Sequence, residues 1–215
     1  MRTGMLARTL TWGAVLLFAG AAAAVEPPEP PEPYGGNGWY LGTQGVYAIE
    51  KFSTTPSFSG VSPVVANNAF GLNVHGGYRF VQDLAIDLEV EYIDGFAVRA
   101  PRPVSGTYRT WNVALNFKVY PLARVFEPGS PWTRVQPFVQ GAPAWQWARW
   151  TGLGALSGNN GSFLGRVGGG ADFYLTKKLS LTANAVYNFT THKLDGLDYI
   201  SIGWGFQYHF GVPEY

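Results

Sequence analysis

The residues best placed to do chemistry are charged side chains that alternate with apolar ones. Asp87, Glu89 and Glu91 fall two residues apart, so in a strand they share one face. Arg79 and Lys118 occupy the polar faces of the segments on either side. Because a buried charge without a partner is costly, we predict that Asp87 and Glu89 bridge Arg79 and Lys118. The expected role of these charged side chains is to fill the interior of the fold. A path for protons or ions is the alternative role.

A second group of polar residues lies later in the chain. Arg166 and Asp172 share one face of their segment, and we expect a similar network there, on the other side of the interior. The stretch "VGGGAD", Val167–Asp172, is similar to a phosphate-binding loop only in composition, because no helix follows it. Its glycines are expected to relieve crowding or to let a wall of strands bend.

Catalysis and metal binding both require side chains that converge. The three histidines, His75, His192 and His209, are scattered over two segments and a loop. Ser201 and His209 share a strand face but lie too far apart along it to touch. No close His–Ser pair falls on an apolar face, where a lipid-modifying site would need it, and the chain has no cysteine. We therefore predict no enzyme, no metal site and no cofactor.

The composition is unusual for a soluble domain. Charged residues make up 13% of the chain and aromatic residues 16%, and there are 28 glycines. A soluble surface needs more charge than this, and a disordered chain contains fewer aromatic residues. The formal net charge of +1 gives no indication of nucleic-acid binding.

The N-terminus has the pattern of an exported protein. Arg2 and Arg8 precede the apolar stretch "TLTWGAVLLFAGAAAA", whose end offers a small-residue cleavage site. Residues 1–24 therefore predict a secretory signal peptide. A short membrane anchor is the alternative, although the apolar core is short for a bilayer span. Residues 25–38, "VEPPEPPEPYGGNG", predict an extended linker rich in Pro and Gly.

The rest of the chain alternates between apolar and polar residues, as in "ISIGWGFQYHF" near the C-terminus. Such alternation predicts strands with one apolar and one polar face. Pro137 and Pro143 interrupt the fifth segment and weaken it. The eight predicted segments are Trp39–Glu50, Asn68–Phe80, Leu84–Asp94, Thr107–Tyr120, Val135–Trp147, Ser162–Tyr174, Leu179–Thr190 and one that starts near Leu197 and ends at Phe210.

Alternation alone does not say which face meets water. The polar faces are sparsely charged, the aromatic residues gather near the ends of the apolar faces, and short turns tend to alternate with longer loops. These features favour lipid outside over a soluble barrel. We predict an all-β fold, an eight-stranded antiparallel up-and-down transmembrane barrel over residues 39–210, with residues 211–215 as a short tail.

Several stretches resemble the small eight-stranded outer-membrane barrels of Gram-negative bacteria, the superfamily of the transmembrane domain of outer membrane protein A. They include "GWYLGTQGVY", "VHGGYRF", "PFVQGAPAW", "VGGGADFYLTKKLSLTANAVYNF" and "GWGFQYHF". The resemblance implies an outer-membrane location, contact with outer-membrane lipid and lipopolysaccharide, and insertion by the outer-membrane assembly machinery. Two departures from the resemblance are expected: the residues "GVPEY" follow Phe210, and no peptidoglycan-binding domain is expected after the barrel, so a role in cell-wall tethering is not implied.

Two charges stand out on the apolar faces. Arg109 begins the fourth segment and Arg149 follows the fifth, so both are expected at the outer rim of adjacent strands. Arginine forks match phosphate geometry. We therefore expect contact with lipopolysaccharide phosphates, and rim residues that simply meet water are the alternative.

The sequence leaves two classes of function open. An eight-stranded barrel has an interior that side chains can fill, which favours a structural or surface-interaction role with an extracellular partner that the sequence does not name. A porin-like narrow channel for small or hydrophobic solutes is the alternative, and a lateral opening near Pro137 and Pro143 would support it. A lipid-modifying enzyme is the third option and the one least supported by the residues.

Overall fold

The computed structural model describes residues 34, 36–52, 65–99, 105–123, 125, 130–151 and 158–210. The predicted signal peptide, the tail and most of the linker lie outside these residues. Within them, eight long strands and the short β2 form one sheet. The strands are β1 (Gly38–Glu50), β2 (Val65–Ala66), β3 (Ala69–Val81), β4 (Leu84–Arg99), β5 (Ser105–Val119), β6 (Val135–Thr151), β7 (Gly158–Tyr174), β8 (Leu179–Thr190) and β9 (Tyr199–His209).

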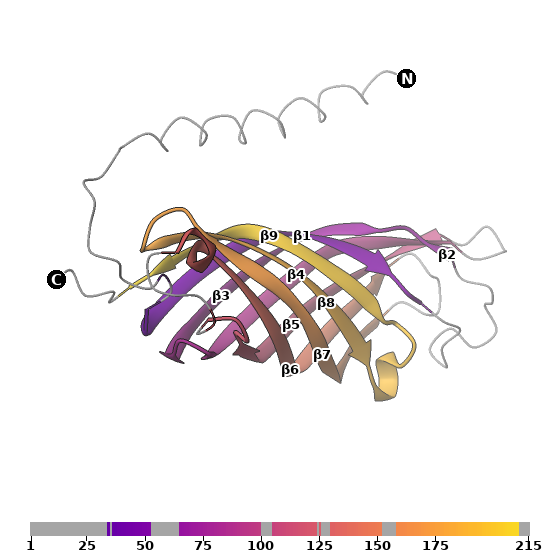
Figure 1. The fold of residues 1–215 in the computed structure, drawn as a ribbon. Helices are drawn as coiled ribbons and strands as arrows, with labels where there is room; N and C mark the ends of the chain where they lie inside the picture. The colour runs from indigo at the N-terminus through magenta and orange to yellow at the C-terminus, as the bar shows by residue number, and fades with distance from the viewer. Residues whose placement is uncertain are drawn as a thin grey trace, which may run out of the picture. The chain divides into compact units, whose positions relative to one another are not determined.

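The sheet closes on itself (Figure 1). Each long strand runs antiparallel to the long strands before and after it in the chain, and the first and last strands, β1 and β9, pair with each other. The closing ladder runs from Tyr40 opposite His209 to Glu50 opposite Tyr199. The predicted fold class, an eight-stranded antiparallel up-and-down barrel, is confirmed.

Several strands, β4 among them, extend further than the sequence pattern indicates, whereas β9 is shorter than its predicted segment. β4 continues to Arg99 and not only to Asp94, because a bulge between Ile93 and Phe96 shifts the alternation without ending the pairing with β5. Gly95 sits in this bulge with a φ of 78°, a conformation that favours glycine. The short β2, which the pattern did not predict, pairs with the extended end of β4.

The prolines of β6 leave its pairing with β7 intact. Pro137 lies opposite Ala171 and Pro143 opposite Gly165 in a ladder that is continuous from Val135 to Trp150. On the other side, the β5–β6 ladder skips from Ala114–Ala144 to Phe117–Gly141 but keeps the same register. The two missing pairs are Leu115–Pro143 and Asn116–Ala142. Proline has no N–H to donate, so Pro143 interrupts the ladder without a change in strand alignment.

The two faces of the barrel wall differ in polarity. Along β9, Trp204 on the outer face keeps 49% of its surface exposed, whereas Gln207 on the inner face keeps 1%. The same holds around the barrel: large apolar side chains lie outside, and polar or charged side chains are buried inside. A soluble barrel would show the reverse. The outer face is therefore the one suited to hydrocarbon, as predicted.

The two ends of the barrel differ in their connections. At the turn end lie the tight turns after β3 and β7, the start of β1 and the end of β9. This end also carries the longer connection between β5 and β6, with its 3-10 helix η2 (Pro131–Arg134). At the loop end lie the connections after β1, β4, β6 and β8, the last of which contains the 3-10 helix η4 (His192–Leu194).

Apolar clusters fill the interior at both ends. The turn-end cluster consists of Tyr40, Ala85, Tyr120 and Phe138, with Ala123 packed against it. The linker residue Tyr34 lies nearby, its ring 5.9 Å from that of Tyr174 and its carbonyl accepting a 2.6 Å hydrogen bond from Gln136 Nε2. The loop-end cluster is larger and consists of Val46, Ala48, Ala66, Ala69, Ile93, Phe96, Tyr108, Ala148, Trp150, Leu194, Leu197 and Tyr199, with Phe52 packed against it.

A substitution at Gly170 tests the expectation that the glycines of "VGGGAD" relieve crowding between neighbouring strands. A Cβ at Gly170 would meet the Ala183 carbonyl oxygen and lie 2.8 Å from Asn184 Cα, both in the backbone of β8. Gly170→Val should lower the free energy of unfolding by about 1–3 kcal/mol, as overpacking usually does. Urea unfolding in detergent micelles would measure it. Gly141→Val is the control, because only the Arg166 carbonyl oxygen, at 3.8 Å, lies near that Cβ position. Equal losses for the two variants would contradict the prediction.

Candidate functional site

The centre of the barrel interior, its lumen, holds an ion pair between β4 and β5. Lys118 Nζ lies 2.7 Å from Asp87 Oδ2, and both side chains are buried. Asp87 also accepts hydrogen bonds from the Tyr40 hydroxyl at 2.9 Å and from Asn116 Nδ2 at 2.7 Å. The expected contact between Asp87 and Lys118 is therefore present, and every oxygen of this carboxylate has a partner.

A second ion-pair group crosses the lumen from β7 to β4. Arg166 places Nη1 2.6 Å from Glu89 Oε1 and Nη2 3.4 Å from Glu91 Oε2. Glu91 also accepts hydrogen bonds from Asn112, Tyr199 and Ser201. The expectation that Arg166 joins Asp172 in a separate network is wrong. The barrel is narrow enough for the long Arg166 side chain to reach the opposite wall, where two carboxylates are available.

Arg79 also differs from the expectation. Its guanidinium donates to the Gln82 carbonyl and to the Tyr174 hydroxyl, the latter at 3.1 Å, and lies 4.0 Å from the centre of the Tyr120 ring. Register alone does not explain this, because Lys118 also lies opposite Ala85 and does reach Asp87. The Gln82 carbonyl and the Tyr174 hydroxyl instead hold the Arg79 guanidinium at the turn-end cluster, away from the carboxylates.

Asp172 lies in the same turn-end region. It accepts hydrogen bonds from the Tyr120 hydroxyl at 3.0 Å and from Thr182 Oγ1 at 2.7 Å. Asp172 and Arg79 thus contact the same tyrosine, Asp172 at the hydroxyl and Arg79 over the ring. All seven charged residues of the predicted network are buried, but they divide into a central set and a turn-end set.

Polar side chains from three strands form a hydrogen-bonded chain that the sequence did not indicate. His75 lies 3.1 Å from both Asn73 Oδ1 and Gln207 Oε1. Gln207 Nε2 lies 3.0 Å from His209 Nε2, and Ser180 Oγ lies 3.4 Å from the same His209 nitrogen. A close Ser–His pair therefore exists, but it is buried in the lumen and not on the lipid-facing surface. Strand pairing brings these residues together, and no local pattern could have located them.

The two outward arginines face each other across a strand pair. Arg109 of β5 and Arg149 of β6 are direct register partners, and Trp111 and Trp147 form the next outward pair below them. Arg109 Nε lies 3.0 Å from Asp94 Oδ1, and both of these side chains are more than half exposed. Like charges directly opposite one another repel. One carboxylate beside two guanidinium groups leaves this rim site with a net positive charge.

The described residues contain no group of three or more His, Cys, Asp or Glu that could hold a metal ion. Among these same residues, no helix is long and apolar enough to cross a membrane.

A closed ring of strands with an apolar exterior and a polar, ion-paired lumen defines a transmembrane β-barrel. The chain belongs to the family described as the outer membrane protein beta-barrel domain, whose model matches residues 12–210. Its location is the outer membrane of Gram-negative bacteria. The predicted superfamily and location are confirmed.

Solved structures support the same fold. Neisserial surface protein A is 15% identical over 80% of this chain and 97% of its own, with a TM-score of 0.57. OprG from Pseudomonas aeruginosa is 11% identical over 86% and 100%, with a TM-score of 0.59. Ail of Yersinia pestis, in complex with the heparin analogue sucrose octasulfate, is 15% identical over 81% and 99%, with a TM-score of 0.54. At these identities the likeness concerns the fold alone. None of the curated proteins matches this chain by sequence.

The central ion pairs predict a dependence of stability on Arg166. Arg166→Met would leave Glu89 and Glu91 buried without their cation and should lower the free energy of unfolding by about 3–5 kcal/mol. At low pH, Glu89 and Glu91 become protonated and no longer repel each other. Lowering the pH should therefore restore much of the lost free energy of unfolding in the variant. Guanidinium unfolding of the folded barrel in micelles at several pH values would measure both effects.

The triple variant Arg166→Met, Glu89→Gln, Glu91→Gln is the matched control, since it removes the carboxylate charges together with the cation. It should recover stability at neutral pH. A single variant as stable as the wild type would show that these ion pairs do not hold the lumen together.

Proposed function

We propose that this chain serves as a closed structural barrel of the outer membrane whose loop end interacts with other surfaces. The observation that carries the proposal is the filling of the lumen. Two central ion-pair groups, formed by Lys118 with Asp87 and by Arg166 with Glu89 and Glu91, lie between the two apolar clusters. Such a sequence of layers leaves water and ions no wide path.

The membrane orientation follows from the connections. Short turns of outer-membrane barrels face the periplasm and longer loops face the exterior. We therefore place the turn end in the periplasm and the loop end outside. The assembly machinery would then meet β9, whose adjoining Phe210 exposes 47% of its surface on the apolar face.

A narrow channel is the second candidate. A lateral opening near Pro137 and Pro143 would favour it, but the β6–β7 ladder is continuous and the β5–β6 register is the same on both sides of the two missing pairs. These features support a closed wall. The buried position of Ser180 and His209 likewise gives no support to a lipid-modifying activity.

The rim site supports contact with lipopolysaccharide. Arg109 and Arg149 sit just beyond the outward tryptophan pair, at the level where a bilayer places its polar interface. Phosphates of lipopolysaccharide could satisfy both guanidinium groups at once. The polysulfated sugar bound to Ail shows that one barrel of this fold accepts a polyanion, which is consistent with an anionic partner here.

Conductance measurements distinguish the closed structural barrel from the narrow channel. Refolded wild-type barrel in a planar bilayer should give no steps above baseline, since the central ion pairs and the end clusters occupy the lumen. A general porin under the same conditions is the positive control. Regular single-channel steps that depend on the presence of folded protein would favour the channel.

The rim site predicts weaker lipopolysaccharide binding in a charge-neutral variant. Arg109→Gln with Arg149→Gln should reduce the apparent affinity about tenfold or more, because hydrogen bonds to charged groups are each worth about 1.5–3 kcal/mol. Binding of lipopolysaccharide micelles to the detergent-solubilised barrel would measure it. Arg134→Gln is the control, since Arg134 is an exposed arginine at the opposite end. Unchanged binding in the double variant would reject the contact.

A further inference from the structure

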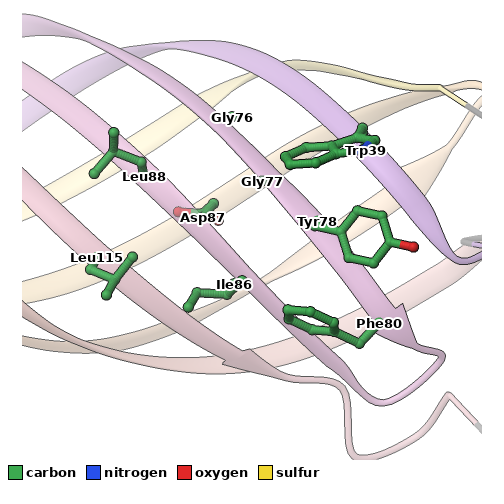
Figure 2. Close-up of a pocket in the computed structure, with 9 residues that line it drawn as sticks. All are labelled: Trp39, Gly76, Gly77, Tyr78, Phe80, Ile86, Asp87, Leu88 and Leu115. Carbon is green, nitrogen blue, oxygen red and sulfur yellow. The ribbon is translucent and has the colours of Figure 1, made fainter.

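A hollow of about 480 Å³ interrupts the outer wall near the turn end (Figure 2). It extends over β1, β3, β4 and β5, with the Gly76–Gly77 pair of β3 between the aromatic residues and the leucines. Its lining is almost entirely apolar, because Asp87 directs its carboxylate into the lumen toward Lys118. The lining residues are Trp39, Gly76, Gly77, Tyr78, Phe80, Ile86, Asp87, Leu88 and Leu115.

The hollow exists because Gly76 has no side chain at an outward position. Its neighbours in the outward series of β3, Val74 and Tyr78, carry side chains, and its partner across the ladder is Leu88. A Cβ at Gly76 would meet only Leu41 Cδ1 at 3.4 Å and the Tyr40 carbonyl oxygen at 3.7 Å. The site therefore has room for a side chain that the sequence does not supply.

The residues around the hollow are exposed to the membrane. Trp39 keeps 66% of its surface exposed and Leu88 55%. Trp39 and Tyr78 pack edge to face, with ring centroids 5.1 Å apart, on the side of the hollow toward the turn, and Phe80 lies beyond them (Figure 2). Amphipathic rings of this kind prefer the level of lipid headgroups. The hollow thus runs from the polar interface toward the leucines, deeper in the membrane.

We infer that this hollow binds one acyl chain of a phospholipid from the periplasmic leaflet, with the headgroup beside Trp39 and Tyr78. The hollow is continuous with the lipid-covered outer face, so hydrocarbon is the material in contact with its edges. An empty space there would lose dispersion contacts that an acyl chain restores. The volume lies in the range of ligand-binding pockets, about 300–1,000 Å³. The choice of leaflet rests on the orientation proposed above, which places the hollow and the arginine pair in opposite leaflets, whereas the acyl-chain site itself does not depend on the proposed function.

Photocrosslinking tests the inference directly. Wild-type barrel would be reconstituted with phosphatidylethanolamine that carries a diazirine on one acyl chain, and adducts would be mapped by mass spectrometry. Adducts should concentrate on the lining residues of the hollow and exceed those elsewhere on the apolar exterior. Gly76→Phe, which fills the hollow, should remove that excess.

Gly141→Phe is the matched control. Gly141 also lies in outward phase with open space around its Cβ position, but on β6 and outside the hollow. It should leave the adducts at the hollow unchanged, and heat-modifiable gel mobility would verify that both variants are folded. If Gly76→Phe does not fold, the wild-type adduct map still decides.

Three outcomes would overturn the inference. The first is an adduct density in the wild type that is uniform over the outer face. The second is a folded Gly76→Phe variant with undiminished labelling of the hollow. The third is a barrel whose hollow is protected from lipid and crosslinks to a second copy of the chain, which would assign the hollow to an oligomer interface.

Discussion

The structure depends on one constraint, that backbone N–H and C=O groups in hydrocarbon must be paired within the protein. An open sheet would leave two unpaired edges in lipid. The ladder between β1 and β9 removes both edges, and it joins the segments furthest apart in the described barrel. Pro143 is compatible with the same constraint, since the two missing pairs are flanked by pairs in unchanged register.

Closure of eight strands creates an interior that must itself be filled. The protein fills it in layers, with aromatic side chains at both ends and ion pairs in the middle. Buried charges are tolerated because each carboxylate of the central group has a cation and additional hydrogen-bond donors. Arg166 of β7 contacts Glu89 and Glu91 of β4, so the central layer connects two walls of the barrel across the lumen.

The outer surface shows a different arrangement in each half of the membrane. At the loop end, the paired guanidinium groups of Arg109 and Arg149 lie beyond tryptophans and present positive charge at the interface. At the turn end, Gly76 leaves an apolar hollow beside Trp39 and Tyr78. The outer membrane is itself asymmetric, with lipopolysaccharide outside and phospholipid inside. In the orientation proposed above, each of the two features matches the chemistry of the leaflet that it would meet.

The sequence by itself determined the strands, their faces and the class of protein, because period-two alternation is a local property of the chain. It also indicated that Arg79, Asp87, Lys118 and Arg166 would point inward. Only the tertiary structure decided which charges meet, since the width of the closed barrel and the competing hydrogen-bond partners set those distances. Arg79 and Lys118 both lie opposite Ala85, but Lys118 reaches Asp87 whereas Gln82 and Tyr174 hold Arg79. The narrow lumen let Arg166 cross to Glu89. The Ser180–His209 contact and the hollow at Gly76 likewise depend on neighbours that are adjacent in the barrel and distant in the chain.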